Sequence, residues 1–343
     1  MSVSRDEIPR LALVGCGAIA ESFYLPALQN DRALLSRMVL VDSSLDRARA
    51  LGARFSIGNC QARHEAVLGA VDGAIIATPH HLHHDIASDF LNAGSHVLCE
   101  KPLTETAEEA RDLVKIAATR NMTLAVNNTR RLLPASTMVR ELLLEQKIGR
   151  VERIIIHEGS EFNWPTASGF YFDRKISSRG VLLDIGAHTL DLLCWWLGGK
   201  PQLVEASLDA CGGIEASVEL TLQYGNTRCE VRLSRLQKLA NKFRVDGERG
   251  FILGDAYDPG GIRIGLDGAT ETEKRVRLKA DDLVPFAEKL VENFLASMRG
   301  ETRPLVAGAD VLDSLSLIDE AYAKAKRFPM PWYEPKEVQL HAS

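Results

Sequence analysis

Short apolar runs alternate with amphipathic stretches along the first third of the chain. The apolar runs predict buried β-strands and the stretches between them predict helices, which is typical of a parallel α/β sheet. Two of the runs stop at Pro79 and at Lys101-Pro102, because a proline pushes the residue before it out of helical geometry. The predicted strands are 11–14, 38–41, 73–78, 96–99 and 123–126, and a helix is predicted over 104–119.

The pattern changes after about residue 128. Apolar and polar residues alternate over 214–223 and 228–233, which predicts strands with one buried and one polar face. Such strands form an antiparallel or mixed open sheet. Two helices are predicted next, over 285–298 and 309–327. At 343 residues the chain exceeds a typical single domain, so we expect two, 1–128 and 129–343.

The composition excludes several classes of protein. With 45% hydrophobic and 25% charged residues, the chain has ample material for a globular core. Its formal net charge of -5 makes it a poor partner for nucleic acid, whose phosphates require basic surfaces. The first ten residues contain no apolar stretch, so no secretory signal is expected.

The cysteines and the most apolar window of the sequence indicate in which compartment the protein works. The six cysteines lie far apart, without a C-x-x-C pair or zinc-like spacing, which fits a reducing cytoplasm. The most apolar window, 181–197, contains Asp184, His188 and Asp191, which excludes a membrane span. We therefore expect a soluble cytoplasmic protein. The cysteines are Cys16, Cys60, Cys99, Cys194, Cys211 and Cys229.

A glycine turn follows the first predicted strand and opens a helix. Residues 15–20, Gly-Cys-Gly-Ala-Ile-Ala, fit G-x-G-x-x-(G/A): Gly15 would make the tight turn and Gly17 would let a pyrophosphate approach the backbone. Asp42 ends the second predicted strand, where a carboxylate accepts hydrogen bonds from ribose hydroxyls and repels a 2′-phosphate. This pattern favours NAD, although Ser43, Ser44 and Arg47 leave NADP open. The alternative is that the glycines only shape a turn and Asp42 caps a helix.

A second set of polar residues lies in the apolar window 181–197, which predicts a buried helix. Asp184, His188 and Asp191 are spaced i, i+4 and i+7, so they share one stripe of that helix. Ser177 or Ser178 is the expected N-cap, and Gly198-Gly199 the expected stop. The stripe indicates either a helix facing a cleft or a core histidine beside a structural aspartate.

The tripeptide Glu100-Lys101-Pro102 ends a predicted parallel strand. Open α/β sheets bind ligands outside the carboxyl ends of their strands. A lysine held there could polarise a substrate oxygen or tune a proton-transfer partner.

Together these motifs resemble the glucose–fructose oxidoreductase/inositol dehydrogenase (Gfo/Idh/MocA) family. The resemblance rests on the glycine turn, on Glu100-Lys101-Pro102, on the run 180–191 and on 78–83, Thr-Pro-His-His-Leu-His. It implies an α/β fold with an N-terminal Rossmann domain and a C-terminal α/β domain whose open, mostly antiparallel sheet serves homodimer or homotetramer contacts. It also implies an NAD(P)-dependent dehydrogenase acting on a sugar, inositol, sugar acid or nucleotide sugar.

The resemblance also assigns roles to residues. It implies a catalytic trio, in which His188 takes the substrate hydroxyl proton, Lys101 hydrogen-bonds the reacting oxygen, and Asp184 binds a neighbouring hydroxyl and orients the imidazole. Asp191 is expected to support the site. The positions expected to bind the cofactor are Gly15, Gly17, Ala18, Ile19, Asp42, Thr78, Pro79, His83, Glu100 and Lys101.

Some features depart from the family pattern. Histidines occupy 80, 81, 83 and 84, which invites a metal site, but no carboxylate or cysteine cluster accompanies them, and no metal is expected. The segment 163–175 is either a substrate loop or a solvated loop. The basic pairs Arg130-Arg131 and Arg174-Lys175 suggest an anionic group on the substrate.

Two other functions compete with a dehydrogenase. Some members of this fold cleave glycosides through transient oxidation with tightly held NAD, and net NADH formation would separate the two activities. A non-catalytic NAD-binding regulator needs no proton-transfer residues, so the presence of the trio argues against it.

Overall fold

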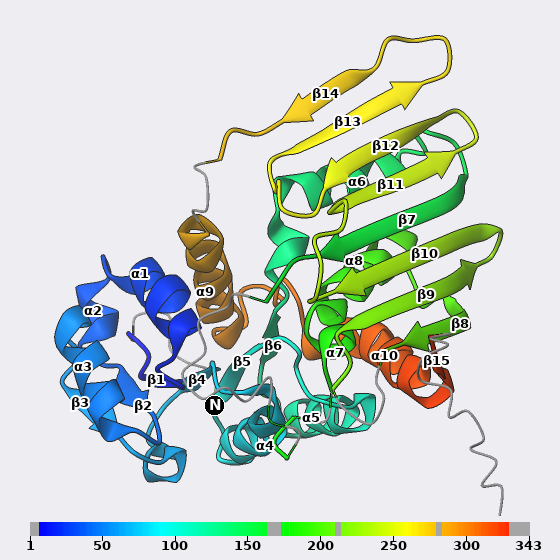
Figure 1. Cartoon of the computed structure of the whole chain (residues 1–343). Coiled ribbons are helices and arrows are strands. Elements are labelled where there is room, and N and C mark those ends of the chain that lie inside the picture. Colours follow the sequence, from blue (N-terminus) through cyan, green and yellow to red (C-terminus); the bar gives the residue numbers. More distant parts are fainter. Residues whose placement is uncertain are drawn as a thin grey trace, which may run out of the picture.

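The computed structural model describes residues 7–162, 173, 175–177, 179–209, 214–278 and 283–328. Most of the predicted loop 163–175, with Arg174, lies outside the described residues, as do Ser178, Cys211 and the tail beyond 328. Two sheets dominate the fold (Figure 1). None of the helices in the described ranges is long and apolar enough to cross a bilayer.

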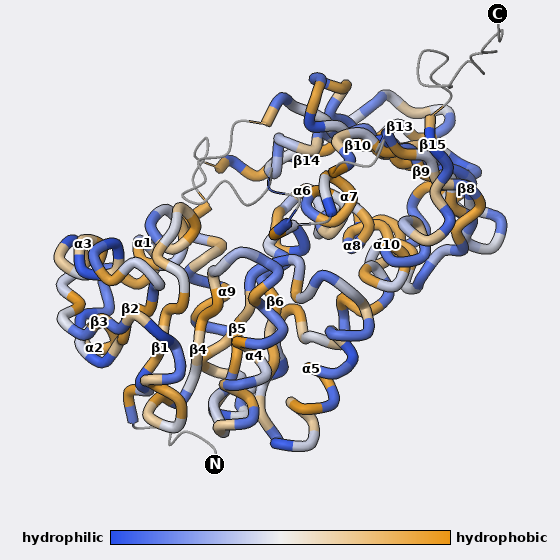
Figure 2. Tube along the Cα trace, turned by 60° about the horizontal axis from the view of Figure 1, so that its bottom comes forward, coloured by the Kyte–Doolittle hydropathy of each residue, from blue (hydrophilic) through white to orange (hydrophobic). Residues whose placement is uncertain are grey.

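The first sheet has six strands, all parallel, in the order β3-β2-β1-β4-β5-β6. Its inner strands are buried, and their apolar character stands out against the hydrophilic loops around them (Figure 2). This confirms the predicted parallel α/β sheet. The strands are β1 (Leu11–Val14), β2 (Val39–Val41), β3 (Asn59–Gln61), β4 (Gly73–Ile76), β5 (His96–Glu100) and β6 (Leu124–Asn127).

Helices cover both faces of this sheet, as is usual for a sheet in which all strands are parallel. The helix after the glycine turn runs as a π-helix, η1 (Ala20–Tyr24), into α1. Helix α5 starts with a capping box, in which Thr106 and Glu109 exchange side-chain-to-backbone hydrogen bonds of 3.2 and 3.0 Å. Besides η1, the helices of this part of the chain are α1 (Leu25–Leu28), α2 (Arg32–Leu35), α3 (Leu45–Phe55), η2 (His64–Val67), η3 (His80–Leu82), α4 (His83–Asn92) and α5 (Ala107–Arg120).

The second sheet has nine strands in the order β14-β13-β12-β11-β7-β10-β9-β8-β15. Only the pairs β7–β10 and β8–β15 are parallel, so the predicted open, mostly antiparallel sheet is confirmed. The strands are β7 (Val151–Gly159), β8 (Gln202–Leu208), β9 (Ser217–Tyr224), β10 (Thr227–Ser234), β11 (Lys242–Gly247), β12 (Gly250–Asp255), β13 (Gly261–Leu266), β14 (Thr272–Arg275) and β15 (Lys326–Arg327).

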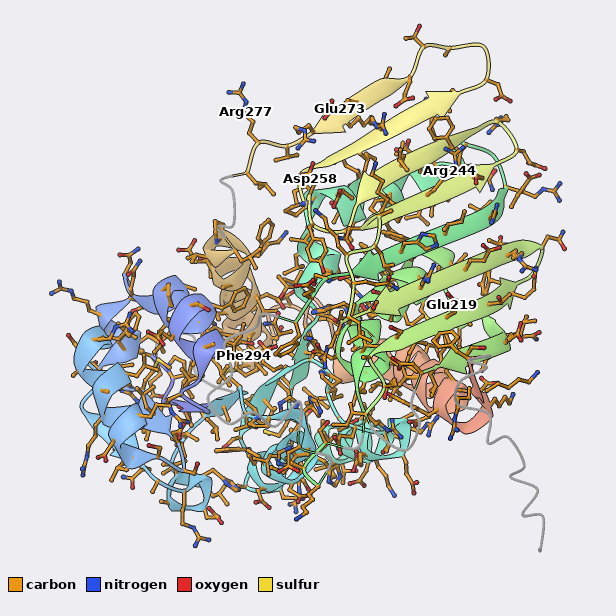
Figure 3. All side chains as sticks on the ribbon, in the orientation of Figure 1. Glu219, Arg244, Asp258, Glu273, Arg277 and Phe294 are labelled. Atoms are coloured by element: carbon orange, nitrogen blue, oxygen red, sulfur yellow. The ribbon has the colours of Figure 1, made fainter. Side chains whose placement is uncertain are left out.

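One face of the second sheet is covered by helices and the other is polar. Val218 and Leu220 are buried toward the helices, whereas Glu219 between them lies on the opposite face, as does Arg244 (Figure 3). This is the alternation that the sequence predicted. The helices are α6 (Pro134–Leu144), α7 (Val181–Asp184), α8 (Gly186–Leu197) and α10 (Leu312–Lys324), with the short turns η4 (Thr129–Leu132) and η6 (Gly308–Val311).

Helix α9 (Val284–Met298) follows the second sheet in sequence but packs on the first. It lies beside α1 and η1 (Figure 1), and Phe294 and Leu290 join the apolar cluster that contains Leu11 and Tyr24. The chain therefore returns to its first half after the second sheet is complete. The division into 1–128 and 129–343 remains a prediction.

The predicted helix over 181–197 is interrupted. It consists of α7 and α8, separated by Ile185, whose carbonyl accepts a tight hydrogen bond of 3.0 Å from the N–H of His188. Gly186, a poor helix former, follows the break. Gly198 ends α8, as predicted, and it adopts the left-handed conformation.

The start of α7 also differs from the prediction. The N–H groups of Gly180 and Leu182 donate to the buried carboxylate of Glu215, at 2.8 and 3.1 Å. Ser177 is not the cap, because its hydroxyl donates to the carbonyl of Arg179. The last predicted helix likewise ends early, at Lys324, where the extended backbone of Ala325 leads into β15.

Candidate active site

A cavity of about 1480 Å³ lies between the two sheets. Its lining comes from the carboxyl ends of strands in the first sheet and from α7, α8 and the second sheet, as α/β folds of this class require. Every residue predicted to bind cofactor or to act in catalysis lines this cavity. They are Gly15, Gly17, Ala18, Ile19, Asp42, Thr78, Pro79, His83, Glu100, Lys101, Asp184 and His188.

The glycine turn forms one end of the cavity. Gly15 has a φ of 95°, and a Cβ there would lie 2.5 Å from the carbonyl oxygen of Ala77, so both backbone conformation and space require glycine. At Gly17, by contrast, a Cβ would meet nothing within 4 Å. The backbone at Gly17 is therefore open to a ligand in the cavity, as a pyrophosphate site needs.

Asp42 is anchored beside this turn. Its carboxylate accepts hydrogen bonds from the N–H groups of Cys16 and Ser44, at 2.9 and 2.8 Å, and contacts the guanidinium of Arg47 at 3.1 Å. The N-cap of α3 is Ser44 rather than Asp42. The carboxylate is thus positioned by the turn itself, at the end where an adenosine ribose would lie.

The residues at the centre of the cavity fit a dinucleotide. The hydroxyl of Thr78 is buried and has no hydrogen-bond partner among the described residues, although it lines the cavity. A buried hydroxyl without a partner is costly, which indicates that a bound group satisfies it. Together with the open backbone at Gly17, this unpaired hydroxyl matches the donor set of a nicotinamide dinucleotide site.

Of the four neighbouring histidines, His83 and His84 contact different partners. His83 contacts the carbonyl oxygens of Pro102 and Thr78, at 2.8 and 2.9 Å, so its ring ties the Lys101-Pro102 segment to the Thr78 segment. His84 lies between Asp85 and Asp112. Burial lowers the pKa of His80 to about 3. Within the described residues, no group of three or more His, Cys, Asp or Glu side chains could hold a metal ion.

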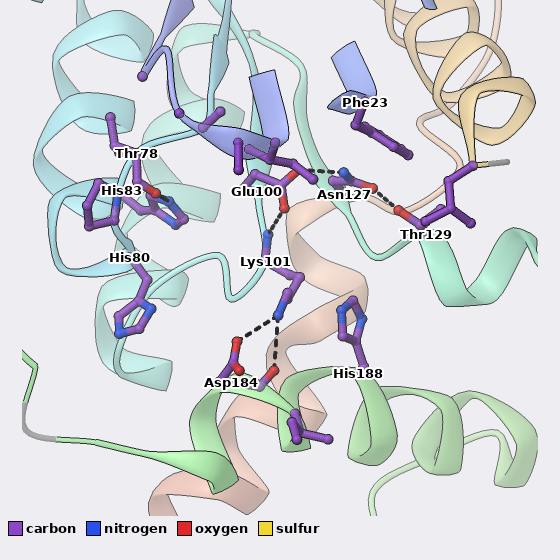
Figure 4. A pocket seen from close by; sticks show the side chains of 18 of the residues that line it. Phe23, Thr78, His80, His83, Glu100, Lys101, Asn127, Thr129, Asp184 and His188 are labelled. Carbon is purple, nitrogen blue, oxygen red and sulfur yellow. Dashed lines mark hydrogen bonds and ion pairs between the residues drawn. The ribbon is translucent and has the colours of Figure 1, made fainter. Parts of the chain in front are cut away.

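Lys101 and Asp184 meet at the other end of the cavity (Figure 4). The ammonium of Lys101 donates to Asp184 Oδ1 at 2.9 Å and to its backbone carbonyl at 3.1 Å. The guanidinium of Arg235, at the end of β10, contacts the second carboxylate oxygen. Burial acts to raise the pKa of Asp184, but the two cations outweigh it and hold the pKa well below its usual range.

His188 lies on the other side of the Lys101 ammonium in Figure 4. Its Nδ1 lies 3.2 Å from the Oδ1 of Asn128, and burial followed by the charges of Lys101 and Arg130 lowers its pKa well below the usual value. The imidazole is therefore neutral at pH 7. With Nδ1–H donating to Asn128, Nε2 carries the lone pair of a base.

The partner of His188 corrects one expectation. Asp184 was expected to orient the imidazole, but its carboxylate is bound by Lys101 and Arg235, and Asn128 holds the ring instead. Asn128 directly follows β6, so the rule of strand carboxyl ends could have identified it. Arg235 had no signal in the sequence, because only the tertiary fold brings the end of β10 to α7.

The expectation of an anion site at Arg130-Arg131 is not supported. Arg130 forms a two-pronged pair with the buried carboxylate of Glu158, at 2.7 and 2.5 Å, and Arg131 does the same with Asp191, at 2.7 and 2.6 Å. Both guanidiniums are therefore neutralised within the protein. Asp191 supports the structure through Arg131, and its carboxylate does not line the cavity.

Comparison with known proteins agrees with this geometry. Residues 9–128 match the model of an oxidoreductase family with an NAD-binding Rossmann fold, and residues 137–253 match the GFO/IDH/MocA C-terminal domain. The chain is 28% identical over 320 residues to 1,5-anhydro-D-fructose reductase of Ensifer adhaerens, covering 90% of this chain and 93% of that protein. It is 25% identical over 328 residues to inositol 2-dehydrogenase of Rhizobium meliloti (strain 1021), covering 91% and 95%.

A solved structure shows the same fold. A 3-ketoreductase from Actinomadura kijaniata, in complex with NADP and TDP-benzene, superimposes with a TM-score of 0.79 at 22% identity, over 93% of this chain and 98% of that chain. The relatives named here are reductases and dehydrogenases, and they give no support to the glycoside hydrolase alternative. The chain belongs to the Gfo/Idh/MocA family of oxidoreductases, and its first sheet is the core of that family's NAD-binding Rossmann domain.

Proposed function

We propose that this protein is a dehydrogenase that transfers a hydride between a carbinol carbon of a sugar or polyol and a nicotinamide dinucleotide. The observation that carries the proposal is the placement of Lys101, Asp184 and neutral His188 in the same cavity as the glycine turn. Two relatives act, by their names, on anhydrofructose and inositol, which are polyhydroxylated compounds.

The dinucleotide would lie along the glycine turn, with its pyrophosphate over Gly17 and its adenosine ribose beside Asp42. When bound, its nicotinamide ring supplies or accepts the hydride. Because the Asp42 carboxylate would face a 2′-phosphate, we propose NAD as the preferred cofactor. A lower Km for NADP than for NAD would contradict this preference.

His188 acts as the base in the direction of oxidation. Its unprotonated Nε2 accepts the proton of the substrate hydroxyl as the hydride leaves the same carbon, and the product is a carbonyl compound. The hydrogen bond from Nδ1 to Asn128 fixes the ring orientation. In the direction of reduction, the same nitrogen returns the proton.

Lys101 stabilises the charge that develops on the reacting oxygen. Its ammonium donates to the carboxylate and to the backbone carbonyl of Asp184, and these two bonds restrict the direction in which the ammonium points. Such a donor, fixed before the reaction begins, needs little reorganisation when charge develops. Asp184 keeps its own charge because Lys101 and Arg235 both lower its pKa.

The test is NADH formation by the purified protein, followed by absorbance, with NAD and a panel of inositols, aldoses, sugar acids and nucleotide sugars. We expect at least one member of the panel to reduce NAD. Measured NAD binding without any NAD reduction across the panel would contradict the proposal.

We also propose that the protein works in the cytoplasm as a homodimer or homotetramer. The proposal is supported by the five described cysteines, all free thiols, and by the polar outer face of the nine-stranded sheet, on which a second copy could pair. Analytical ultracentrifugation would test the oligomer, and a monomer at micromolar concentration would contradict it.

A further inference from the structure

Exposed apolar side chains gather at the rim of the catalytic cavity. Of the large apolar side chains that are exposed in the described part of the chain, five line this cavity. Exposed apolar groups that cluster at a cavity mark a binding surface, whereas scattered ones are ordinary. The five, with their exposed fractions, are Leu82 39%, Ile176 39%, Tyr257 52%, Val276 46% and Leu283 46%.

Three of them, Tyr257, Val276 and Leu283, lie in the second half of the chain and line this same cavity. They come from the loop after β12, the segment after β14 and the residue before α9. We call these three residues the apolar rim. Leu278, a fourth apolar residue from the same side, also lines the cavity. The apolar rim is thus assembled from segments that the chain brings together only in the folded state.

The loop that carries Tyr257 is held in place. The N–H of Tyr257 donates to the carboxylate of Asp255 at 2.8 Å, and its hydroxyl lies 3.5 Å from that of Ser160. The N–H of Val276 donates to the carbonyl of Gly260 at 2.8 Å, so the two segments of the rim are tied together. A Cβ at Gly260 would lie 2.6 Å from the Val276 carbonyl oxygen, which explains the glycine. The backbone that carries Tyr257 is therefore held at the edge of the cavity.

The apolar rim and the proposed catalytic residues line the same cavity. Strand β7 connects the two regions: Glu158 near its end binds Arg130 at 2.7 Å, and the hydroxyl of Ser160, directly after it, lies 3.5 Å from that of Tyr257. A ligand that reacts at Lys101 and His188 can thus extend within this cavity to the ring of Tyr257.

The cations around the proposed catalytic residues and the apolar rim are paired with carboxylates. In the described part of the chain, the lysine and arginines that line this region of the cavity form four ion pairs: Lys101 and Arg235 with Asp184, Arg130 with Glu158, and Arg275 with Asp258 (Asp258 is labelled in Figure 3). A phosphate or carboxylate on the substrate would have to compete with these carboxylates for a cation. Such a site favours a neutral substrate.

We propose that the substrate is a neutral glycoside whose apolar aglycone packs on the apolar rim while its hydroxylated ring reacts at Lys101 and His188. This inference rests on the proposed dehydrogenase function and narrows its substrate class. The ring carbinol loses a hydride to the nicotinamide and a proton to His188, and becomes a ketone. The glycosidic bond stays intact, so the aglycone contributes binding and takes no part in the chemistry.

The experiment compares matched substrates of the holoenzyme with NAD. For each of several sugars, the free sugar, its methyl glycoside, its phenyl glycoside and its 6-phosphate are assayed for NADH formation. We expect kcat/KM for the phenyl glycoside to exceed that for the methyl glycoside by about tenfold or more, which is the effect of burying part of an aromatic ring. The gain should appear mainly in KM. The phosphate should be the poorest substrate.

Substitutions in the apolar rim test whether the preference for the phenyl glycoside arises there. Tyr257→Ala should reduce the phenyl-to-methyl ratio of kcat/KM toward one, whereas Tyr257→Phe keeps the ring and should keep the ratio. Leu283→Asp should also reduce the ratio, because the introduced charge would be desolvated by the aglycone. Leu144→Ala is the matched control, because Leu144 is 67% exposed on α6 and does not line the cavity.

The outcomes separate the two proposals. Equal kcat/KM for phenyl and methyl glycosides, a preference for the phosphate, or a ratio unchanged in Tyr257→Ala would overturn the glycoside inference and leave the dehydrogenase standing. No NADH with any compound, despite NAD binding, would overturn both.

Discussion

Asp184 and Asp191 lie on one stripe of the segment 181–197, yet their surroundings differ. The carboxylate of Asp184 faces the cavity, where Lys101 and Arg235 each contact one of its oxygens. The carboxylate of Asp191 is nearly inaccessible and forms a two-pronged pair with Arg131. The same helical spacing thus leads into the proposed active site at one end and into the core at the other.

The two carboxylates also differ in pKa. Burial raises the pKa of Asp191, and Arg131 opposes only part of that shift. At Asp184 burial acts in the same direction, but two cations reverse it and the pKa falls. Helical spacing alone therefore does not identify a catalytic carboxylate. The number of cations that the fold brings to it separates the two environments.

The largest expected effect is a loss of turnover when His188, near the cavity end of the stripe, or its neighbour Lys101 is replaced. His188→Ala or Lys101→Ala should lower kcat by at least about two orders of magnitude, the usual contribution of acid–base groups. Steady-state kinetics would measure the loss, and equilibrium binding should show NAD affinity close to wild type for His188→Ala. Lys324→Ala, which removes an exposed lysine paired with Glu320, is the control. Substantial turnover in both catalytic variants would rule out the mechanism.

The next effect is on stability at the core end of the stripe. Arg131→Ala leaves the Asp191 carboxylate buried without its guanidinium, and should lower the free energy of unfolding by about 3 kcal/mol. Urea unfolding would measure it. Replacing both partners, Arg131→Met with Asp191→Leu, should restore part of the loss. Arg153→Ala, at an exposed pair with Glu230, should cost less than about 1 kcal/mol. Equal losses at both pairs would contradict the distinction.

A smaller, pH-dependent effect is expected at Arg235. Because the folded pKa of Asp184 is lowered, its ionised form stabilises the protein above the usual carboxyl pKa of about 3.9, and this stabilisation is lost as the pH falls through the folded value. Arg235→Met removes one of the two cations, so it should cost about 2 kcal/mol at pH 7. The cost should be smaller at pH 3, below the usual carboxyl pKa, because Asp184 with only one cation takes up a proton there more readily than in the wild type. Urea unfolding at the two pH values would test this, and a cost independent of pH would contradict it.

The smallest effect concerns the orientation of His188. Asn128→Asp places a carboxylate beside Nδ1 and should raise the lowered pKa of His188 toward the ordinary histidine value of about 6.5. Protonated His188 cannot accept the substrate proton, so kcat/KM for oxidation should fall several-fold more at pH 6 than at pH 8, relative to wild type. Asn128→Ala should lower activity without this pH dependence. Parallel pH profiles for Asn128→Asp and wild type would show that Asn128 does not position the base.

Much of the first sheet could be predicted from the sequence, because its buried strands are continuous apolar runs. Strand β3 was missed, since Asn59–Gln61 is a short polar edge strand that gains only one neighbour. The break at Ile185 was also missed, because the apolar pattern continues through it. Within the site, the residues that the sequence identified all line the cavity, but the contacts that Asn128 and Arg235 make with them were missed.

By itself, the sequence determined the features that depend on near neighbours in the chain. These are the glycine turn with Asp42 at the next strand end, the position of Lys101 at a strand terminus and the spacing of Asp184 and His188. Only the tertiary structure determined which charged side chains contact one another. It paired Arg130 and Arg131 with buried carboxylates, brought Arg235 to Asp184 and built the apolar rim from three separate segments. The reason is that desolvation and Coulomb energies depend on distances in space, which spacing along a chain does not specify.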